Sequence, residues 1–289
     1  MNTNQRDTAD LPVRCKLTLV YVISLVIAVL MAGVSLAGLL FQTSIYPTEE
    51  LVQGFVPNDV VNLIIGLPVL LGSMWLARRG KLLGLLFWPG ALFYVFYTYT
   101  IYVFSMPLNV AFLLHLTLVT LSAYTMIGLI ACIDGKVVQD RLTGAVPERF
   151  GGGVLAVLGI LFLLRVVIVL VDALINLTPV TTVELALHVT DFIMSPVWII
   201  GGVLLRRREA LGYVTGLGLL FSASMLFIGL IFALCLQPLL TSGEFVLVDV
   251  LVVFVMGLVC FIPFALFVRG VASTRNSASS ELSYKGYGP

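Results

Sequence analysis

The chain contains 289 residues, of which 60% are hydrophobic and only 11% are charged, whereas soluble domains carry about 25% charged residues. The 16 Lys and Arg residues nearly balance the 15 Asp and Glu residues, which leaves a formal net charge of +1. This composition predicts an integral membrane protein and excludes the basic surface that nucleic-acid binding requires.

Eight apolar segments are long enough to cross a membrane, because a hydrocarbon core of about 30 Å needs roughly 20 helical residues. In chain order they are 17–41, 59–77, 82–104, 110–132, 152–175, 183–205, 210–236 and 246–268. All should be helices, since runs such as 154–164 are apolar on every side, whereas strands of a membrane barrel alternate. The first segment exceeds the apolar core of a signal peptide, about 7 to 15 residues. We expect it to remain as a membrane anchor.

The connections predict the orientation. Every Lys and Arg except Arg165 lies before the first span, between spans two and three, four and five, or six and seven, or after the eighth. The other connections contain none and carry Glu49, Glu50 and Glu244. Because basic loops stay in the cytoplasm, we expect both termini to be cytoplasmic and the protein to lie in a prokaryotic plasma membrane.

A shift of 128 residues, the separation of Gly90 and Gly218, predicts an internal duplication. The shift sets residues of spans two and three on identical residues of spans six and seven: Pro68, Val69, Leu76, Arg78, Arg79, Leu83, Gly84 and Gly90 on Pro196, Val197, Leu204, Arg206, Arg207, Leu211, Gly212 and Gly218. Each half has an even number of spans, so the repeats are expected to lie parallel. The alternative is convergence on generic membrane composition.

The predicted fold is therefore an all-α integral membrane protein with eight transmembrane helices. Residues 1–16 form a cytoplasmic segment, 17–150 and 151–269 form two four-helix halves, and 270–289 form a disordered cytoplasmic tail. Pro68 and Pro196 are expected to kink equivalent helices, a pattern that marks transport sites. Proline is also common in ordinary transmembrane helices, which is the simpler interpretation.

Ionisable side chains within the spans collect in the outer half of the bilayer. Each costs about 2.5 to 3.5 kcal/mol at the centre of a membrane helix and needs a partner or a water-filled cavity. Asp59 and Asn62 lie near the outer mouth of span two. The residues predicted to bind a substrate or ion are Arg165, Asp172, Glu184, His188, Asp191, His115 and Asp249.

Spans five and six carry most of these residues at helical spacing. Arg165, Asp172 and Asn176 share one face of span five, and Glu184, His188 and Asp191 share one face of span six. Counting about 1.5 Å per residue from the short loop between the spans brings Arg165 near Asp191. We expect an ion pair there, either in the working site or as a purely structural contact.

The histidines, cysteines and tyrosines each allow more than one interpretation. His115 and His188 have matching depths that suit a haem or, with carboxylates, a divalent metal, but we expect hydrogen-bonding or protonatable groups and no cofactor. None of Cys15, Cys132, Cys235 and Cys260 forms a C-x-x-C pair, so no thiol-disulfide relay is expected. The tyrosines of span three fit an interfacial belt and helix packing, or a cavity for a cationic or amphipathic ligand.

No catalytic or nucleotide-binding motif occurs in the chain. The polar groups favour a small-solute or proton/ion-coupled transporter with its site in the outer half of the bilayer. One alternative is a non-catalytic complex subunit, sensor or assembly factor. The other is an enzyme acting on a lipid-like substrate, with His188 and a carboxylate as acid and base. The expected partners are the lipid bilayer and a small-molecule or ion ligand, and the sequence leaves the oligomeric state open.

Overall fold

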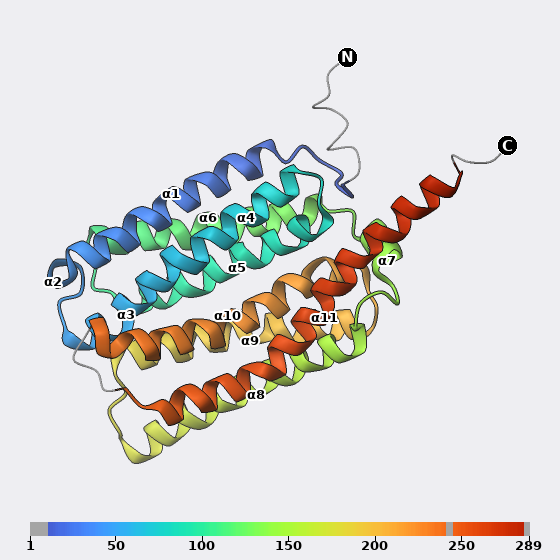
Figure 1. Ribbon diagram of the computed structural model, residues 1–289. Coiled ribbons are helices and arrows are strands. Elements are labelled where there is room, and N and C mark those ends of the chain that lie inside the picture. The colour runs from blue at the N-terminus through green and yellow to red at the C-terminus, as the bar shows by residue number, and fades with distance from the viewer. Residues whose placement is uncertain (1–10, 241–244, 286–289) are drawn as a thin grey trace.

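A computed structural model describes residues 11–240 and 245–285 and folds them into helices joined by short connections (Figure 1). The elements are α1 (Thr18–Leu40), α2 (Gln42–Ile45), α3 (Glu49–Val61), the π-helical turn η2 (Asn62–Gly66), α4 (Leu67–Arg78), α5 (Leu82–Ser105), α6 (Val110–Cys132), α7 (Gly135–Leu142), α8 (Glu148–Asn176), α9 (Thr182–Arg206), α10 (Ala210–Leu240) and α11 (Leu247–Lys285).

Within the described residues, eight helical spans are long and apolar enough to cross a membrane, which confirms a multi-pass membrane protein. The second span is longer than the hydropathy pattern predicts, because α3, η2 and α4 run on from Glu49 to Arg78. Thr48 caps this helix by accepting the Leu51 amide, and Glu49 and Glu50 lie in its first turn, where acidic side chains are favourable. Helix α11 continues to Lys285, so the structure has helix over residues 270–285, where we expected a tail without regular structure.

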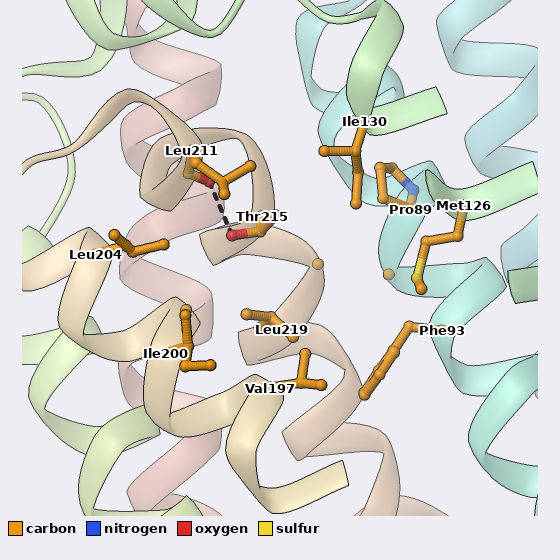
Figure 2. A pocket seen from close by; sticks show the side chains of 13 residues that line it. Pro89, Phe93, Met126, Ile130, Val197, Ile200, Leu204, Leu211, Thr215 and Leu219 are labelled. Carbon is orange, nitrogen blue, oxygen red and sulfur yellow. Dashed lines mark hydrogen bonds between the residues drawn. The ribbon is translucent and has the colours of Figure 1, made fainter. Parts of the chain in front are cut away.

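Helices α5 and α10 cross at the centre of the bundle. In α5, 78% of the most apolar stretch is buried, against 44% or less in the other spans. A Cβ atom at Gly90 would collide with the backbone of Gly218, so glycine at this position permits the close approach. Beside the crossing, α6 and α9 border an apolar cavity (Figure 2).

The two ends of the bundle differ in charge. We call the basic end the one where α4 meets α5 and α9 meets α10, because Arg78, Arg79 and Arg206 lie there. The opposite, acidic end carries Glu49 and Glu50, and Figure 1 shows α2 and α3 at this end, far from α7.

At the basic end, residues 11–16 are fastened to the end of α6. A disulfide joins Cys15 to Cys132, 117 residues apart in the sequence. Beside it, Val13 and Ile133 form an antiparallel bridge. The cysteine spacing gave no sign of this pairing, because the fold alone brings the start of α1 and the end of α6 together.

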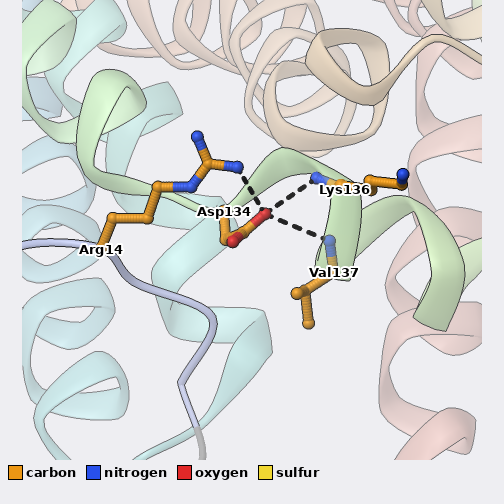
Figure 3. A network of polar contacts seen from close by, with 4 residues as sticks. All are labelled: Arg14, Asp134, Lys136 and Val137. Carbon is orange, nitrogen blue, oxygen red and sulfur yellow. Dashed lines mark hydrogen bonds and ion pairs between the residues drawn. The ribbon is translucent and has the colours of Figure 1, made fainter.

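An exposed ion pair reinforces the same contact. The Arg14 guanidinium donates to the Asp134 carboxylate at 2.9 Å, and the same carboxylate oxygen accepts the amides of Lys136 and Val137 at the start of α7 (Figure 3). The hydrogen bond from Arg14 holds the pKa of the Asp134 carboxyl below its ordinary value of 3.8. One carboxylate therefore caps a helix and anchors the segment before α1.

Candidate functional site

Asp59 lies at the centre of a buried polar cluster near the acidic end. Its side chain is 1% exposed. One carboxylate oxygen accepts a 2.5 Å hydrogen bond from the Tyr46 hydroxyl, and the other accepts a 3.0 Å bond from the Tyr102 hydroxyl. Asn58 Nδ2 donates in turn to Tyr102 at 3.4 Å. Among the described residues no Lys or Arg pairs with Asp59, so the carboxyl group is held by neutral donors.

Three helices and the connection between α2 and α3 meet at this carboxyl group, because a glycine of α1 leaves room for it. Gly38 of α1 faces the cluster, where a Cβ atom would collide with Asp59 and lie 2.6 Å from the Tyr46 hydroxyl. Asp59 comes from α3 and Tyr102 from α5, while Tyr46 lies between α2 and α3. The backbone leaves the helical conformation at Phe41, after α1, and the short helix α2 then carries the chain to Tyr46.

The cluster continues along α5 to His115. The Ser35 and Tyr99 hydroxyls lie 3.2 Å apart, and either can donate. The His115 ring stacks on Tyr99, with centroids 5.6 Å apart, and meets Tyr102 edge-on at 4.9 Å. His115 is 2% exposed, and its Nδ1 atom has no hydrogen-bond partner. We call Asp59, Tyr46, Tyr102, Asn58, Ser35, Tyr99 and His115 the Asp59 cluster.

One helical turn from Asp59, the second span changes its winding. The π-helical turn η2 begins at Asn62, whose Oδ1 atom accepts a 2.8 Å hydrogen bond from the Tyr94 hydroxyl. The Nδ2 atom of Asn62 is buried and has no partner. Single π-helical turns occur frequently at functional sites. This turn and the unpartnered Asn62 amide both lie beside the Asp59 cluster.

A surface groove of about 380 Å³ at the acidic end adjoins the Asp59 cluster at Tyr46. Tyr46 is one of its lining residues, and the hydroxyl of the same side chain reaches Asp59. Burial, together with the neighbouring Asp59 charge, raises the pKa of Tyr46 well above its ordinary value of 10.0. The hydroxyl therefore stays protonated and serves as a donor between the groove and the carboxyl group.

The expected ion pair between Arg165 and Asp191 is not formed, and that prediction was wrong. Asp191 is 1% exposed and accepts a 2.7 Å hydrogen bond from the Tyr97 hydroxyl of α5. Arg165 lies exposed on α8 and has no ion-pair partner among the described residues. Counting residues along a helix predicts depth, and the Arg165 charge does act on Asp191, but the two side chains do not approach closely enough to form an ion pair.

Three other predicted site residues are exposed and have local contacts. Asp172 accepts a hydrogen bond from Asn176 at 2.9 Å, as their spacing in α8 allows. Glu184 completes a capping box with Thr181 at the start of α9. Asp249 lies exposed in the first turn of α11. None of the three side chains belongs to the Asp59 cluster.

The two histidines lie in different surroundings. His115 belongs to the Asp59 cluster, whereas His188, which is 5% exposed, lies on α9 one turn from Asp191. Its Nδ1 atom is also buried without a partner. Among the described residues no three His, Cys, Asp or Glu side chains come together as metal ligands.

The two prolines of the proposed repeat also differ in their surroundings. Pro68 follows η2 in the first turn of α4, whereas Pro196 lies inside the continuous helix α9. The regular winding is therefore interrupted by a π-helical turn in the first half, next to Asn62, and not at the equivalent place in α9.

The buried tyrosines of α5 connect the two halves. Tyr94, Tyr99 and Tyr102 bond to residues of the first half, and Tyr97 bonds to Asp191 of the second. Span three thus contacts span six, a contact that the sequence did not indicate. The sequence did reveal Asp59 as a carboxyl group near the outer mouth, but Tyr46 lies in a connection whose path no periodicity predicts.

No family model matches the chain, and no curated protein or solved structure matches it.

Proposed function

We propose that the protein is a proton- or ion-coupled transporter of a small solute, with its coupling site at Asp59. The observation that carries this proposal is a carboxyl group 1% exposed, bound by two tyrosine hydroxyls and paired with no cation among the described residues. Burying such a charge costs about 2.5 to 3.5 kcal/mol on insertion scales. A bound proton or metal cation removes that cost, and its release restores it.

The surroundings of Asp59 support a route for the coupling ion. Tyr46 separates the groove at the acidic end from the carboxyl group by one side chain. The π-helical turn that begins at Asn62 provides an irregular segment at which the second span can bend. The proposed site remains in the outer half of the bilayer but lies in the first four-helix half.

We also propose that residues 17–150 and 151–269 are parallel repeats related by an axis through the α5–α10 crossing. Gly90 and Gly218, equivalent under the shift, contact each other. An element on a two-fold axis must meet its own counterpart in this way.

A second pair of glycines supports the same relation. A Cβ atom at Gly84 would meet Leu76 and Ala77 at the α4–α5 turn. At Gly212 it would meet Leu204 and Leu205, the residues 128 positions later, at the α9–α10 turn. The two turns thus pack alike, as expected for duplicated halves.

The proposed orientation has both termini in the cytoplasm of a prokaryotic cell, because the connections at the basic end carry Lys and Arg. Reporter fusions after Gly80, Gly144 and Arg208 should then report the cytoplasm, and a fusion after Gly54 the outside. In this orientation the Cys15–Cys132 disulfide faces a reducing compartment, where disulfides are rare, so this observation counts against the orientation. Exchanged readouts at two of the fusion sites would reverse the assignment.

A pH jump applied to proteoliposomes on a solid-supported membrane tests the coupling site. Wild-type protein should give a transient charge displacement as Asp59 gains or loses its ion. Asp59→Asn should reduce the displacement at least about tenfold, while the exposed control Asp172→Asn should leave it unchanged. A full signal from Asp59→Asn would overturn the assignment of the coupling site.

Arg165 supports a second candidate function, a subunit of a membrane complex. Its side chain lies exposed well inside the fifth span, where contact with lipid is costly and charged groups ordinarily face protein or water. A neighbouring protein surface would satisfy it. A photo-reactive residue at Arg165 should then cross-link a second polypeptide in native membranes, whereas one at exposed Leu19 of α1 should not; equal labelling by lipid at both positions would reject this candidate.

A further inference from the structure

The apolar cavity near the basic end is bordered by four spans. It has a volume of about 220 Å³, and Figure 2 shows side chains of α6 and α9 pointing into it from opposite sides. Met126 and Leu204 are among these side chains, and the Gly90–Gly218 crossing forms part of the lining. Thr215, on α10, donates its hydroxyl to the Leu211 carbonyl at 2.9 Å. The one polar side chain of the cavity lining is therefore already hydrogen-bonded within α10.

The equivalent position in the other half is filled. Under the shift of 128 residues Thr215 corresponds to Phe87, so this step rests on the repeat proposed above. The Phe87 ring packs against Phe221 at 4.9 Å and Phe264 at 5.6 Å. An aromatic ring thus occupies one half where threonine leaves space in the other.

Basic side chains gather where the cavity approaches the end of the bundle. Its lining residues Leu204 and Leu211 flank the α9–α10 turn, which contains Arg207. A Cβ atom at Gly135 would lie 3.3 Å from Ala210, which brings the start of α7 and Lys136 to the same turn. Arg207 and Lys136 are exposed and form no ion pair among the described residues.

We propose that this cavity holds the part of one acyl chain nearest the headgroup of an anionic glycerophospholipid, whose phosphate lies between Lys136 and Arg207. The lining suits a hydrocarbon chain, because it is apolar apart from the Thr215 hydroxyl, which is already bonded to the Leu211 carbonyl. The two unpaired cations match the headgroup charge and lie at the end of the bundle where the spans leave the membrane. The bound lipid bridges the two halves, since its chain contacts α6 on one side and α9 on the other.

Lipid retention by the full-length protein tests this site. The protein is reconstituted into vesicles of equal parts phosphatidylglycerol and phosphatidylcholine, extracted in detergent and measured by native mass spectrometry. Wild-type protein should retain one phosphatidylglycerol. Thr215→Phe, which places in the cavity the ring found at Phe87, should lower retention at least about tenfold, whereas Ile168→Phe on the exposed face of α8 should not. Lys136→Gln and Arg207→Gln should each weaken retention about fivefold.

The outcomes separate this proposal from the one at Asp59. Full retention of phosphatidylglycerol by Thr215→Phe would overturn the cavity as the binding site, and equal retention of both lipids by wild-type protein would overturn the headgroup assignment. A dimer peak lost with Thr215→Phe would assign the cavity to a second copy instead. Thermal unfolding of Thr215→Phe and the smaller Thr215→Leu verifies that each is folded. The Asp59 charge displacement should persist in both Thr215 variants. Failure of the lipid proposal can therefore be told apart from failure of the Asp59 proposal.

Discussion

Asp59 and Arg165 are charged residues of two different halves, and their surroundings are opposite. Asp59 is enclosed by α1, α3 and α5 and has a donor on each carboxylate oxygen. Arg165 is exposed on α8 and has no ion-pair partner among the described residues. Helical spacing predicts which residues share a face, but neighbouring helices decide whether that face lies inside. The difference favours the first half as the place where ions bind and the second as a surface for contact with other molecules.

Removing the Asp59 carboxyl group should give the largest loss of stability. Asp59→Leu leaves the Tyr46 and Tyr102 hydroxyls without their acceptor, at about 1 to 3 kcal/mol for each buried group. The exposed control Asp172→Leu should stay within about 0.5 kcal/mol of wild type. Thermal unfolding in detergent compares them, and equal losses would remove the contrast between the two regions.

Glycine substitutions in α1 probe the space around the Asp59 cluster. Gly38→Ala forces a methyl group against Asp59 and Tyr46 and should cost about 1 to 3 kcal/mol. Gly33 lies on the same helix and faces open space, so Gly33→Ala should be neutral or stabilising by up to about 1 kcal/mol. The same unfolding assay measures both. If Gly38→Ala proved as stable as Gly33→Ala, the close packing of the cluster would be contradicted.

Double-mutant cycles at Asp191 should distinguish its hydrogen bond with Tyr97 from the ion pair with Arg165 that the sequence predicts. Tyr97→Phe with Asp191→Leu should show a coupling of about 0.6 kcal/mol, typical of hydrogen bonds between membrane helices. Arg165→Leu with Asp191→Leu should couple by no more than about 0.5 kcal/mol, because the Arg165 charge acts on Asp191 without an ion pair between the two side chains. A larger coupling in the second cycle would restore the Arg165–Asp191 pair to the site.

The ion pair at the basic end should give the smallest effect, because it is exposed. Arg14 lowers the pKa of Asp134 in the folded protein, so the stabilising contribution is present above the ordinary pKa of 3.8 and is lost as the pH falls through the lowered value. Amide hydrogen exchange at Lys136 and Val137 should therefore show less protection in strong acid than at neutral pH, once corrected for intrinsic rates. In Asp134→Asn that dependence should disappear, and its persistence would assign it to another group.

The sequence predicts the membrane fold because long apolar runs specify helical spans without reference to their neighbours. It also predicts local pairs along one helix, such as Asp172 with Asn176. It does not predict the Cys15–Cys132 disulfide or the Tyr46–Asp59 bond, since both depend on where a connection turns and which helices meet. The hydropathy pattern does not predict residues 49–58 as part of the second span, because polar residues lower the apolar content of α3. The Thr48 cap and the acidic residues of the first turn nevertheless favour a helix there.

Infrared difference spectroscopy between acidic and alkaline buffers tests the central claim most directly, because the C=O stretch of a protonated carboxyl group reports proton binding without a transported substrate. We predict a band in the wild-type spectrum that is lost in Asp59→Asn and retained in Asp172→Asn. A band that survives in Asp59→Asn, or a spectrum in which no carboxyl group buried in the bundle changes with pH, would contradict proton binding at Asp59.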